Sequence, residues 1–121
     1  MSTLRPIDGL TALDLMRIAL DPAAVMEAAG APPDAWQADV LRKATRVGFR
    51  GLLLTARQSG KSTSLSALAV WWALVRPERD VLVIAPTLRQ AVELVYKCRH
   101  VVDQLGVKLS SDSATKLVLG P

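Results

Sequence analysis

Residues 52–64, LLLTARQSGKSTS, join a short apolar run to residue types that bind phosphate. A P-loop has a glycine, four residues of any type, then Gly-Lys and Ser or Thr. The chain matches this pattern at Gly60, Lys61 and Ser62, but Thr55 stands where the first glycine belongs. In such a loop the second glycine lets backbone N–H groups approach the anion, the lysine reaches the β- and γ-phosphates, and the serine hydroxyl binds Mg²⁺.

The flanking residues decide between this site and an ordinary strand-to-helix turn capped by one of its own serines. Residues 49–56, FRGLLLTA, form a short apolar run whose length and following Gly-Ser punctuation favour a fully buried strand. From Lys61, apolar residues recur at helical spacing as far as Val75, before Arg76-Pro77 ends the helix. A strand followed by a helix is the context in which the motif binds phosphate, so we expect a nucleotide site.

The order of strand and helix repeats once more along the chain. Residues 79–86, RDVLVIAP, are predicted to form a second buried strand, and residues 88–106 an amphipathic helix that ends at a glycine. Alternating strands and helices indicate a parallel sheet with right-handed crossovers, the α/β class. The last stretch, residues 107–121, contains two short strand-like pieces around a polar turn.

The first 48 residues are predicted to be helical. Residues 11–20 have helical apolar spacing, residues 23–30 end at a glycine, and residues 31–48 restart after two prolines with Asp34 as N-cap. We therefore divide the chain into a helical N-terminal segment, 1–48, and a second part, 49–121.

Composition narrows the class of protein. The chain has 121 residues, half of them hydrophobic, and a formal net charge of +4, which permits a nucleic-acid partner without requiring one. Cys98 is the single cysteine, so an intramolecular disulfide and a thiolate zinc cluster are excluded. The N-terminus lacks the features of a signal peptide, and the longest apolar run, residues 67–75, is about half the length that crosses a bilayer. We expect a cytoplasmic protein that is neither secreted nor embedded in a membrane.

A few other side chains attract notice. Trp71 and Trp72 cannot face the same side of a helix, so one is expected in the core and the other partly exposed. Cys98 is expected to be a small buried apolar group, and His100 to have a structural or surface role.

Three stretches together resemble the large terminase subunits of tailed bacteriophages, the motors that package DNA. Residues 56–63, ARQSGKST, resemble the family's deviant Walker A motif. Residues 21–42 look like its N-terminal segment with the adenine-recognition motif, here Trp36-Gln37, and residues 81–94, VLVIAPTLRQAVEL, are similar to its helicase-like motif Ia. The resemblance implies a P-loop NTPase of the additional-strand, helicase- and terminase-like kind, with a parallel sheet that is incomplete in this chain.

The resemblance also implies ATP and Mg²⁺ as cofactors. Arg57 and Lys61 take catalytic roles and Ser62 binds the metal, whereas Trp36 stacks and Gln37 pairs with the adenine edge. Without the resemblance, Trp36 reads as a core aromatic and Arg57 as a solvated loop cation. The nucleotide-binding residues implied are Trp36, Gln37, Thr55, Ala56, Arg57, Gln58, Ser59, Gly60, Lys61, Ser62 and Thr63, and those of motif Ia are Pro86, Thr87 and Gln90.

The acidic residues that such a motor needs are missing from this sequence. Neither predicted strand is followed by the Asp-Glu pair of a Walker B motif, and no carboxylate cluster matches the family's nuclease. Because metal-assisted charge stabilisation supplies most of the rate of phosphoryl transfer, we expect the chain alone to bind nucleotide without hydrolysing it efficiently. An incomplete sheet also predicts an exposed apolar edge and self-association.

The sequence thus predicts the ATP-binding part of a terminase large subunit, which couples ATP hydrolysis to packaging of double-stranded DNA into procapsids. The family implies contact with DNA through the full-length protein, a portal protein and a small subunit as partners, and a homo-oligomeric ring when complete. Two alternatives stay open: a fragment of a helicase-like DNA translocase, and a non-catalytic P-loop remnant or binding module.

Overall fold

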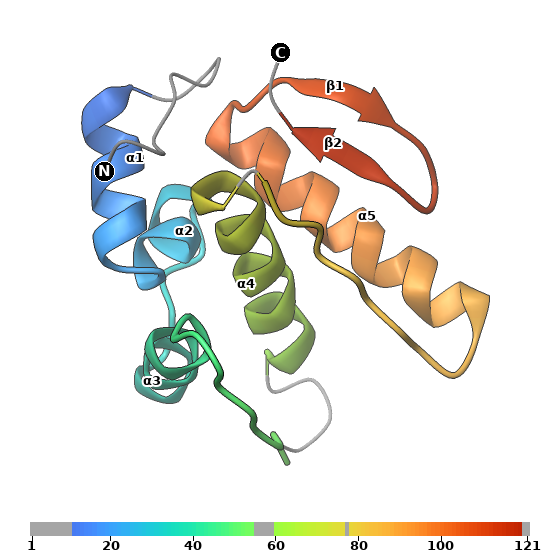
Figure 1. Cartoon of the computed structure of the whole chain (residues 1–121), viewed down its shortest axis with the longest axis horizontal. Helices are drawn as coiled ribbons and strands as arrows, with labels where there is room; N and C mark the ends of the chain where they lie inside the picture. Colours follow the sequence, from blue (N-terminus) through green and yellow to red (C-terminus); the bar gives the residue numbers. More distant parts are fainter. Residues whose placement is uncertain (1–10, 55–59, 77, 120–121) are drawn as a thin grey trace.

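In the parts of the chain that the structure describes, five helices pack together and a short two-stranded hairpin follows the last of them (Figure 1). The structure is a computed structural model, and it describes residues 11–54, 60–76 and 78–119. The elements are α1 (Ala12–Leu20), α2 (Ala23–Ala28), α3 (Ala35–Ala44), α4 (Lys61–Val75), α5 (Leu88–Leu105), β1 (Leu109–Asp112) and β2 (Leu117–Leu119).

The helix ends follow the local chemistry of the sequence. The Thr11 side chain accepts a hydrogen bond from the backbone N–H of Asp14 at 3.1 Å and so caps α1. α5 ends at Gly106, whose φ of 75° is open to glycine at little cost. The predicted helices in residues 11–48, from Lys61 to Val75 and from 88 to 105 are therefore confirmed.

The core is built around α4. In Figure 1, α1, α2 and α3 lie on one side of this helix and α5 on the other, and the buried side chains of all five helices join in one cluster. Trp71 is buried, and its indole N–H donates to the backbone oxygen of Ile18 at 2.7 Å. The ring of Trp72 packs edge to face against the ring of Trp71, with 5.1 Å between the two ring centroids. Trp72 is partly exposed, as predicted. The cluster thus joins the N-terminal helices to α4.

The prediction of a parallel sheet is wrong. The one sheet in the described ranges has two strands, β1 and β2, which pair antiparallel with each other. Residues 51–54 and 80–85 carry no strand, and the apolar side chains of Leu52, Leu54, Leu82 and Ile84 are 82–86% exposed. The chain as described is mostly helical, so it does not have the predicted α/β P-loop NTPase fold.

The two apolar runs do not form strands because a strand also needs a second segment that hydrogen-bonds to its backbone. A strand exists only where a neighbouring segment accepts and donates ladder hydrogen bonds, and no described residue does so for 51–54 or 81–85. The shortness and apolar character of these two runs predicted buried strands. Without a partner for their backbones, both runs lie along the surface of the structure instead.

The C-terminal hairpin agrees with the two predicted strand-like pieces. Leu109 pairs with Leu119 and Asp112 with Leu117, and a bulge separates Leu109 from Ser111. Arg99 of α5 holds the hairpin, because its guanidinium donates to the Asp112 carboxylate and to the Ser113 carbonyl, each at 2.8 Å.

Candidate phosphate-binding site

Gly60 stands at the start of α4 with a backbone conformation that favours glycine. Its φ is +92°, in the left-handed region. A Cβ atom at this position would lie 2.5 Å from Nε2 of Gln37, closer than real side chains approach. The backbone conformation therefore favours glycine here, and a side chain would also displace the amide end of Gln37.

The carbonyl of Gly60 collects three hydrogen bonds. It accepts from the backbone N–H of Ser64 at 3.0 Å, from the Ser64 hydroxyl at 2.9 Å, and from the Gln37 side-chain amide at 3.0 Å. Ser64 is fully buried, so its hydroxyl is held in this position by the packing around it. The junction is fixed from within α4 and from α3 at the same time.

Gln37 links the two stretches that the sequence singled out. Its amide nitrogen donates to Gly60, and its Oε1 accepts from the backbone N–H of Asp34 at 2.8 Å, at the start of α3. The side chain is only 5% exposed. It keeps one N–H and one lone pair for any further partner, so its main role in this arrangement is to hold the junction in place.

Trp36 lies next to the same junction. It is half-buried, and its indole Cζ2 is 3.9 Å from the position that a Cβ of Gly60 would take. The predicted adenine-recognition pair therefore lies beside Gly60 of the predicted phosphate-binding motif, although Gln37 and Gly60 are 23 residues apart in the sequence.

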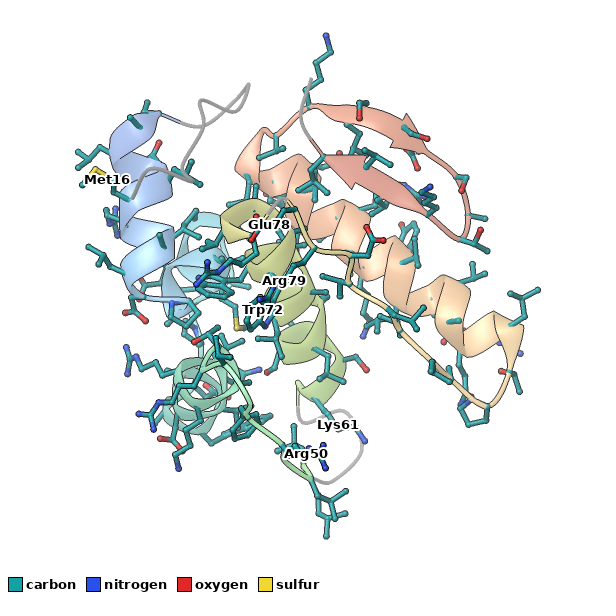
Figure 2. The ribbon with its side chains drawn as sticks, in the orientation of Figure 1. Met16, Arg50, Lys61, Trp72, Glu78 and Arg79 are labelled. Carbon is teal, nitrogen blue, oxygen red and sulfur yellow. The ribbon has the colours of Figure 1, made fainter. Side chains whose placement is uncertain are left out.

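The first turn of α4 presents donors and a cation. No described side chain accepts from the backbone N–H groups of Lys61, Ser62 or Thr63, and the Lys61 side chain is exposed. Figure 2 shows Lys61 at the end of the molecule where α4 begins, with Arg50, a cation that the motif did not predict, at the same end of the view. Aligned peptide dipoles and free N–H groups give a helix start an affinity for anions. This arrangement is chemically suited to a phosphate group.

The other predicted loop residues, Thr55, Ala56, Arg57, Gln58 and Ser59, lie outside the described residues.

The predicted motif Ia residues lie at the start of another helix. The Thr87 hydroxyl accepts from the backbone N–H of Gln90 at 3.2 Å and caps α5. Pro86, Thr87 and Gln90 are all exposed. No hydrogen bond among the described residues joins them to Gly60 or Gln37.

The two remaining candidates have ordinary surroundings. Cys98 is buried beside the carbonyl of Ser66, and burial raises the pKa of its thiol to about 11. His100 is exposed on α5. Both observations agree with the sequence interpretation.

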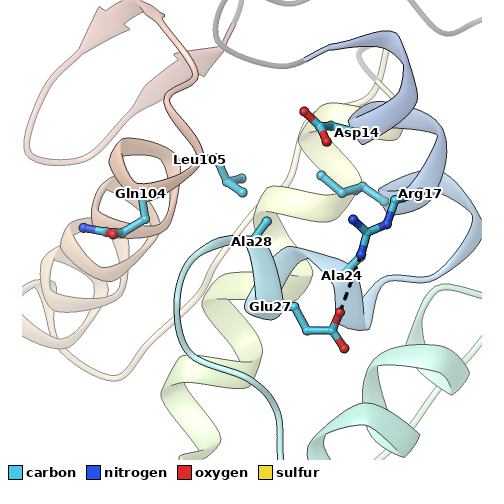
Figure 3. Close-up of a pocket in the computed structure, with 8 residues that line it drawn as sticks. Asp14, Arg17, Ala24, Glu27, Ala28, Gln104 and Leu105 are labelled. Atoms are coloured by element: carbon cyan, nitrogen blue, oxygen red, sulfur yellow. Dashed lines mark ion pairs between the residues drawn. The ribbon is translucent and has the colours of Figure 1, made fainter.

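A separate concavity lies between α1, α2 and the end of α5 (Figure 3). It measures about 300 Å³ and is bordered by Asp14, Arg17, Glu27 and Gln104. Arg17 and Glu27 face each other across 3.9 Å, and both are more than half exposed. An exposed pair of this kind contributes little, and its two charges are matched by each other.

Two features are absent from the described residues. No three His, Cys, Asp or Glu side chains lie close enough together there to hold a metal ion. None of the helices in these ranges combines the length and the apolar character that crossing a membrane requires.

Comparison with known proteins gives no relative for this chain: no family model, curated protein or solved structure matches it.

Proposed function

We propose that this chain binds Mg²⁺-ATP at the junction of Gly60 and α4, as the ATP-binding part of a phage terminase large subunit. The observation that supports the proposal is the hydrogen bond from Gln37 to the Gly60 carbonyl. It joins two of the three stretches on which the resemblance depends, and nothing in their separate sequences requires them to touch.

The chemistry of the residues fits a triphosphate and its metal. The exposed ammonium of Lys61 and the N–H groups of the first turn of α4 are groups that bind anions, and the Ser62 hydroxyl is the hard oxygen donor that Mg²⁺ prefers. When bound, the metal neutralises charge on the phosphate oxygens. Gln37 and Ser64 hold the Gly60 carbonyl so that the donors of α4 stay in place.

Binding is proposed without efficient turnover. The sequence places no Asp-Glu pair after an apolar run, so it offers no second metal ligand and no activator for water. Lys61, together with Arg57 of the loop, takes the role of stabilising charge on the phosphates. In this proposal, hydrolysis, DNA translocation, and contact with a portal protein, a small subunit or a ring of copies are assigned to a complete terminase large subunit and not to this chain by itself.

The test is calorimetric titration of the purified chain with Mg²⁺-ATP, with phosphate release followed in the same samples. Replacing Lys61 by Ala removes a charge-assisted contact, so Kd is expected to rise about tenfold or more. Arg89→Ala is the matched control, because Arg89 is an exposed cation in the first turn of α5 and is expected to leave Kd unchanged.

Equal weakening by both substitutions would show only a general attraction of cations for ATP, and would overturn the site. Rapid phosphate release that disappears in Lys61→Ala would overturn the proposal of binding without turnover.

A further inference from the structure

The corner between α1 and α2 holds a carboxylate in a fixed position. Asp21 follows the last residue of α1, and its backbone N–H donates to the carbonyl of Arg17 at 2.9 Å. Its Oδ1 accepts from the backbone N–H of Ala23, the first residue of α2, at 3.1 Å. Because the backbone of Asp21 is tied to α1 and its side chain to α2, the corner itself sets the direction of the carboxylate.

Arg42, in the last turn of α3, contacts both oxygens of this carboxylate. Its Nε donates to Oδ1 and its Nη2 to Oδ2 of Asp21, each at 3.1 Å. The hydrogen bond from Arg42 holds the pKa of the Asp21 carboxyl below its usual value. Most exposed ion pairs contribute little, but two parallel bonds from a planar guanidinium fix an angle as well as a distance. The pair therefore constrains how α3 is oriented against the corner.

Two directional contacts join α3 to other elements. Among the described residues, the side-chain hydrogen bonds that do so are those from Gln37 to Gly60 and from Arg42 to Asp21. Leu41, fully buried in the core, adds an apolar contact, which has no preferred direction. Arg42 lies about 140° around the helix from Gln37 and about 7.5 Å along it. With one contact at each of these points, α3 is held against rotation about its own axis.

The neighbouring ion pair on α3 has no such effect. Lys43 binds Asp39 at 2.9 Å, and the two side chains are 56% and 61% exposed, close to the 57% of Arg42. Both partners belong to α3, so their contact cannot set the orientation of the helix relative to the rest of the chain. Adjacent positions thus offer one pair that orients α3 and one that does not.

We propose that Asp21 and Arg42 are positioning residues for the phosphate-binding junction, because their ion pair sets the rotation of α3 that brings the Gln37 amide to the Gly60 carbonyl. The effect passes from the corner of α1 and α2, through α3, to the start of α4. Its part in phosphate binding rests on the proposed function, whereas the coupling of the ion pair to the bond between Gln37 and Gly60 does not.

A double-mutant cycle on unfolding tests this coupling without nucleotide. If Arg42 acts through Gln37, the double variant Arg42→Ala with Gln37→Leu loses less stability than the sum of the two single losses. Lys43→Ala is the matched control, and its loss is expected to add to that of Gln37→Leu. Arg42→Lys keeps the charge but not the paired donors, so it is expected to behave like Arg42→Ala. Urea denaturation measures all of these variants.

ATP affinity tests the consequence for the junction. Arg42→Ala and Asp21→Asn are each expected to raise the Kd for Mg²⁺-ATP about threefold, and Lys43→Ala to leave it unchanged. Asparagine keeps an Oδ1 that can accept from Ala23, so the corner is retained. Removing the carboxylate of Asp21 also makes the chain more positive, so a general attraction of charge would tighten ATP binding. The opposite sign is the mark of a positioning role, and in the Gln37→Leu background the effect of Arg42→Ala is expected to disappear.

Three results would overturn these assignments. Additive losses of stability for Arg42→Ala and Gln37→Leu would show that the ion pair does not act on the Gln37 contact. Equal effects of Arg42→Ala and Lys43→Ala on Kd, or tighter binding by Asp21→Asn, would leave only an effect of charge. If the unaltered chain binds no ATP while the stability cycle is non-additive, the proposed function fails and the pair orients α3 without serving a phosphate site.

Discussion

The starts of α4 and α5 are built differently, although each follows an extended apolar segment and a short polar stretch. α5 begins at Thr87, whose hydroxyl accepts one of the first N–H groups of the helix. α4 begins at Gly60 in the left-handed region, with no side-chain cap. Here the side chains of Gln37 and Ser64 donate hydrogen bonds to the carbonyl of Gly60, whereas at α5 a side chain accepts from a backbone N–H group.

The difference separates a helix start whose own side chain accepts from its N–H groups from one whose first N–H groups have no acceptor among the described side chains. A capping hydroxyl occupies the position that an anion would take at the helix start. At Gly60 the side-chain hydrogen bonds reach the carbonyl, and no described side chain accepts from the first N–H groups of α4. Of these two starts, therefore, α4 is the one suited to bind phosphate.

The largest effect is expected from Gly60→Ala. A left-handed alanine costs about 1–2 kcal/mol, and loss of the hydrogen bond that Gln37 makes adds about 1 kcal/mol. Gly30→Ala is the control, because Gly30 has φ +82° but nothing within 4 Å of an added Cβ. Urea unfolding is expected to show about 1 kcal/mol more loss for Gly60→Ala than for Gly30→Ala.

Only Gly60→Ala is also expected to weaken Mg²⁺-ATP binding, by tenfold or more. Equal losses of stability and equal ATP affinity in the two variants would mean that the contact with Gln37 does not constrain the start of α4.

A smaller effect is expected from Gln37→Leu. The substitution keeps the size of a buried side chain but leaves the Gly60 carbonyl and the Asp34 N–H each with one partner fewer, at a cost of about 1–2 kcal/mol. Gln104→Leu, on the exposed surface of α5, is expected to change stability by less than about 0.5 kcal/mol. Chemical denaturation measures both.

ATP affinity distinguishes a positioning role for Gln37 from a purely structural one. If Gln37→Leu lowers stability yet leaves the ATP Kd unchanged in the folded chain, the bond does not hold the phosphate-binding donors.

The smallest effect is expected from Thr87→Ala. Loss of the cap costs about 1 kcal/mol, and Thr87→Ser is expected to recover most of it. Thermal unfolding followed by circular dichroism measures the change. ATP affinity is expected to stay the same, and a loss of affinity would place the start of α5 in the nucleotide site.

The elements that the sequence predicted correctly are those whose determinants are local. The glycines at 30 and 106, the cap at Asp34 and the helical apolar spacing act within a few residues, so the helices were predictable. The sheet was not, since an apolar run such as 81–85 indicates a strand only if a partner is available.

The candidate site divides in the same way. The residues of the loop motif and the start of α4 at Lys61 follow from the sequence pattern. The bond from Gln37 to Gly60 depends on how α3 packs against α4, and no local pattern encodes that contact. Its one advance signal was the resemblance, which marked both residues without giving the link between them.

The bond between the Trp71 indole and the Ile18 carbonyl has a consequence for synthesis on the ribosome. The two residues are 53 positions apart, so α1 leaves the ribosome well before its partner on α4 has been made. At the usual translation rates this delay is about 3–10 s. During that time Ile18 and Leu15, both buried in the finished core, lack the surface that covers them. The apolar face of α1 therefore stays uncovered on the nascent chain until α4 arrives.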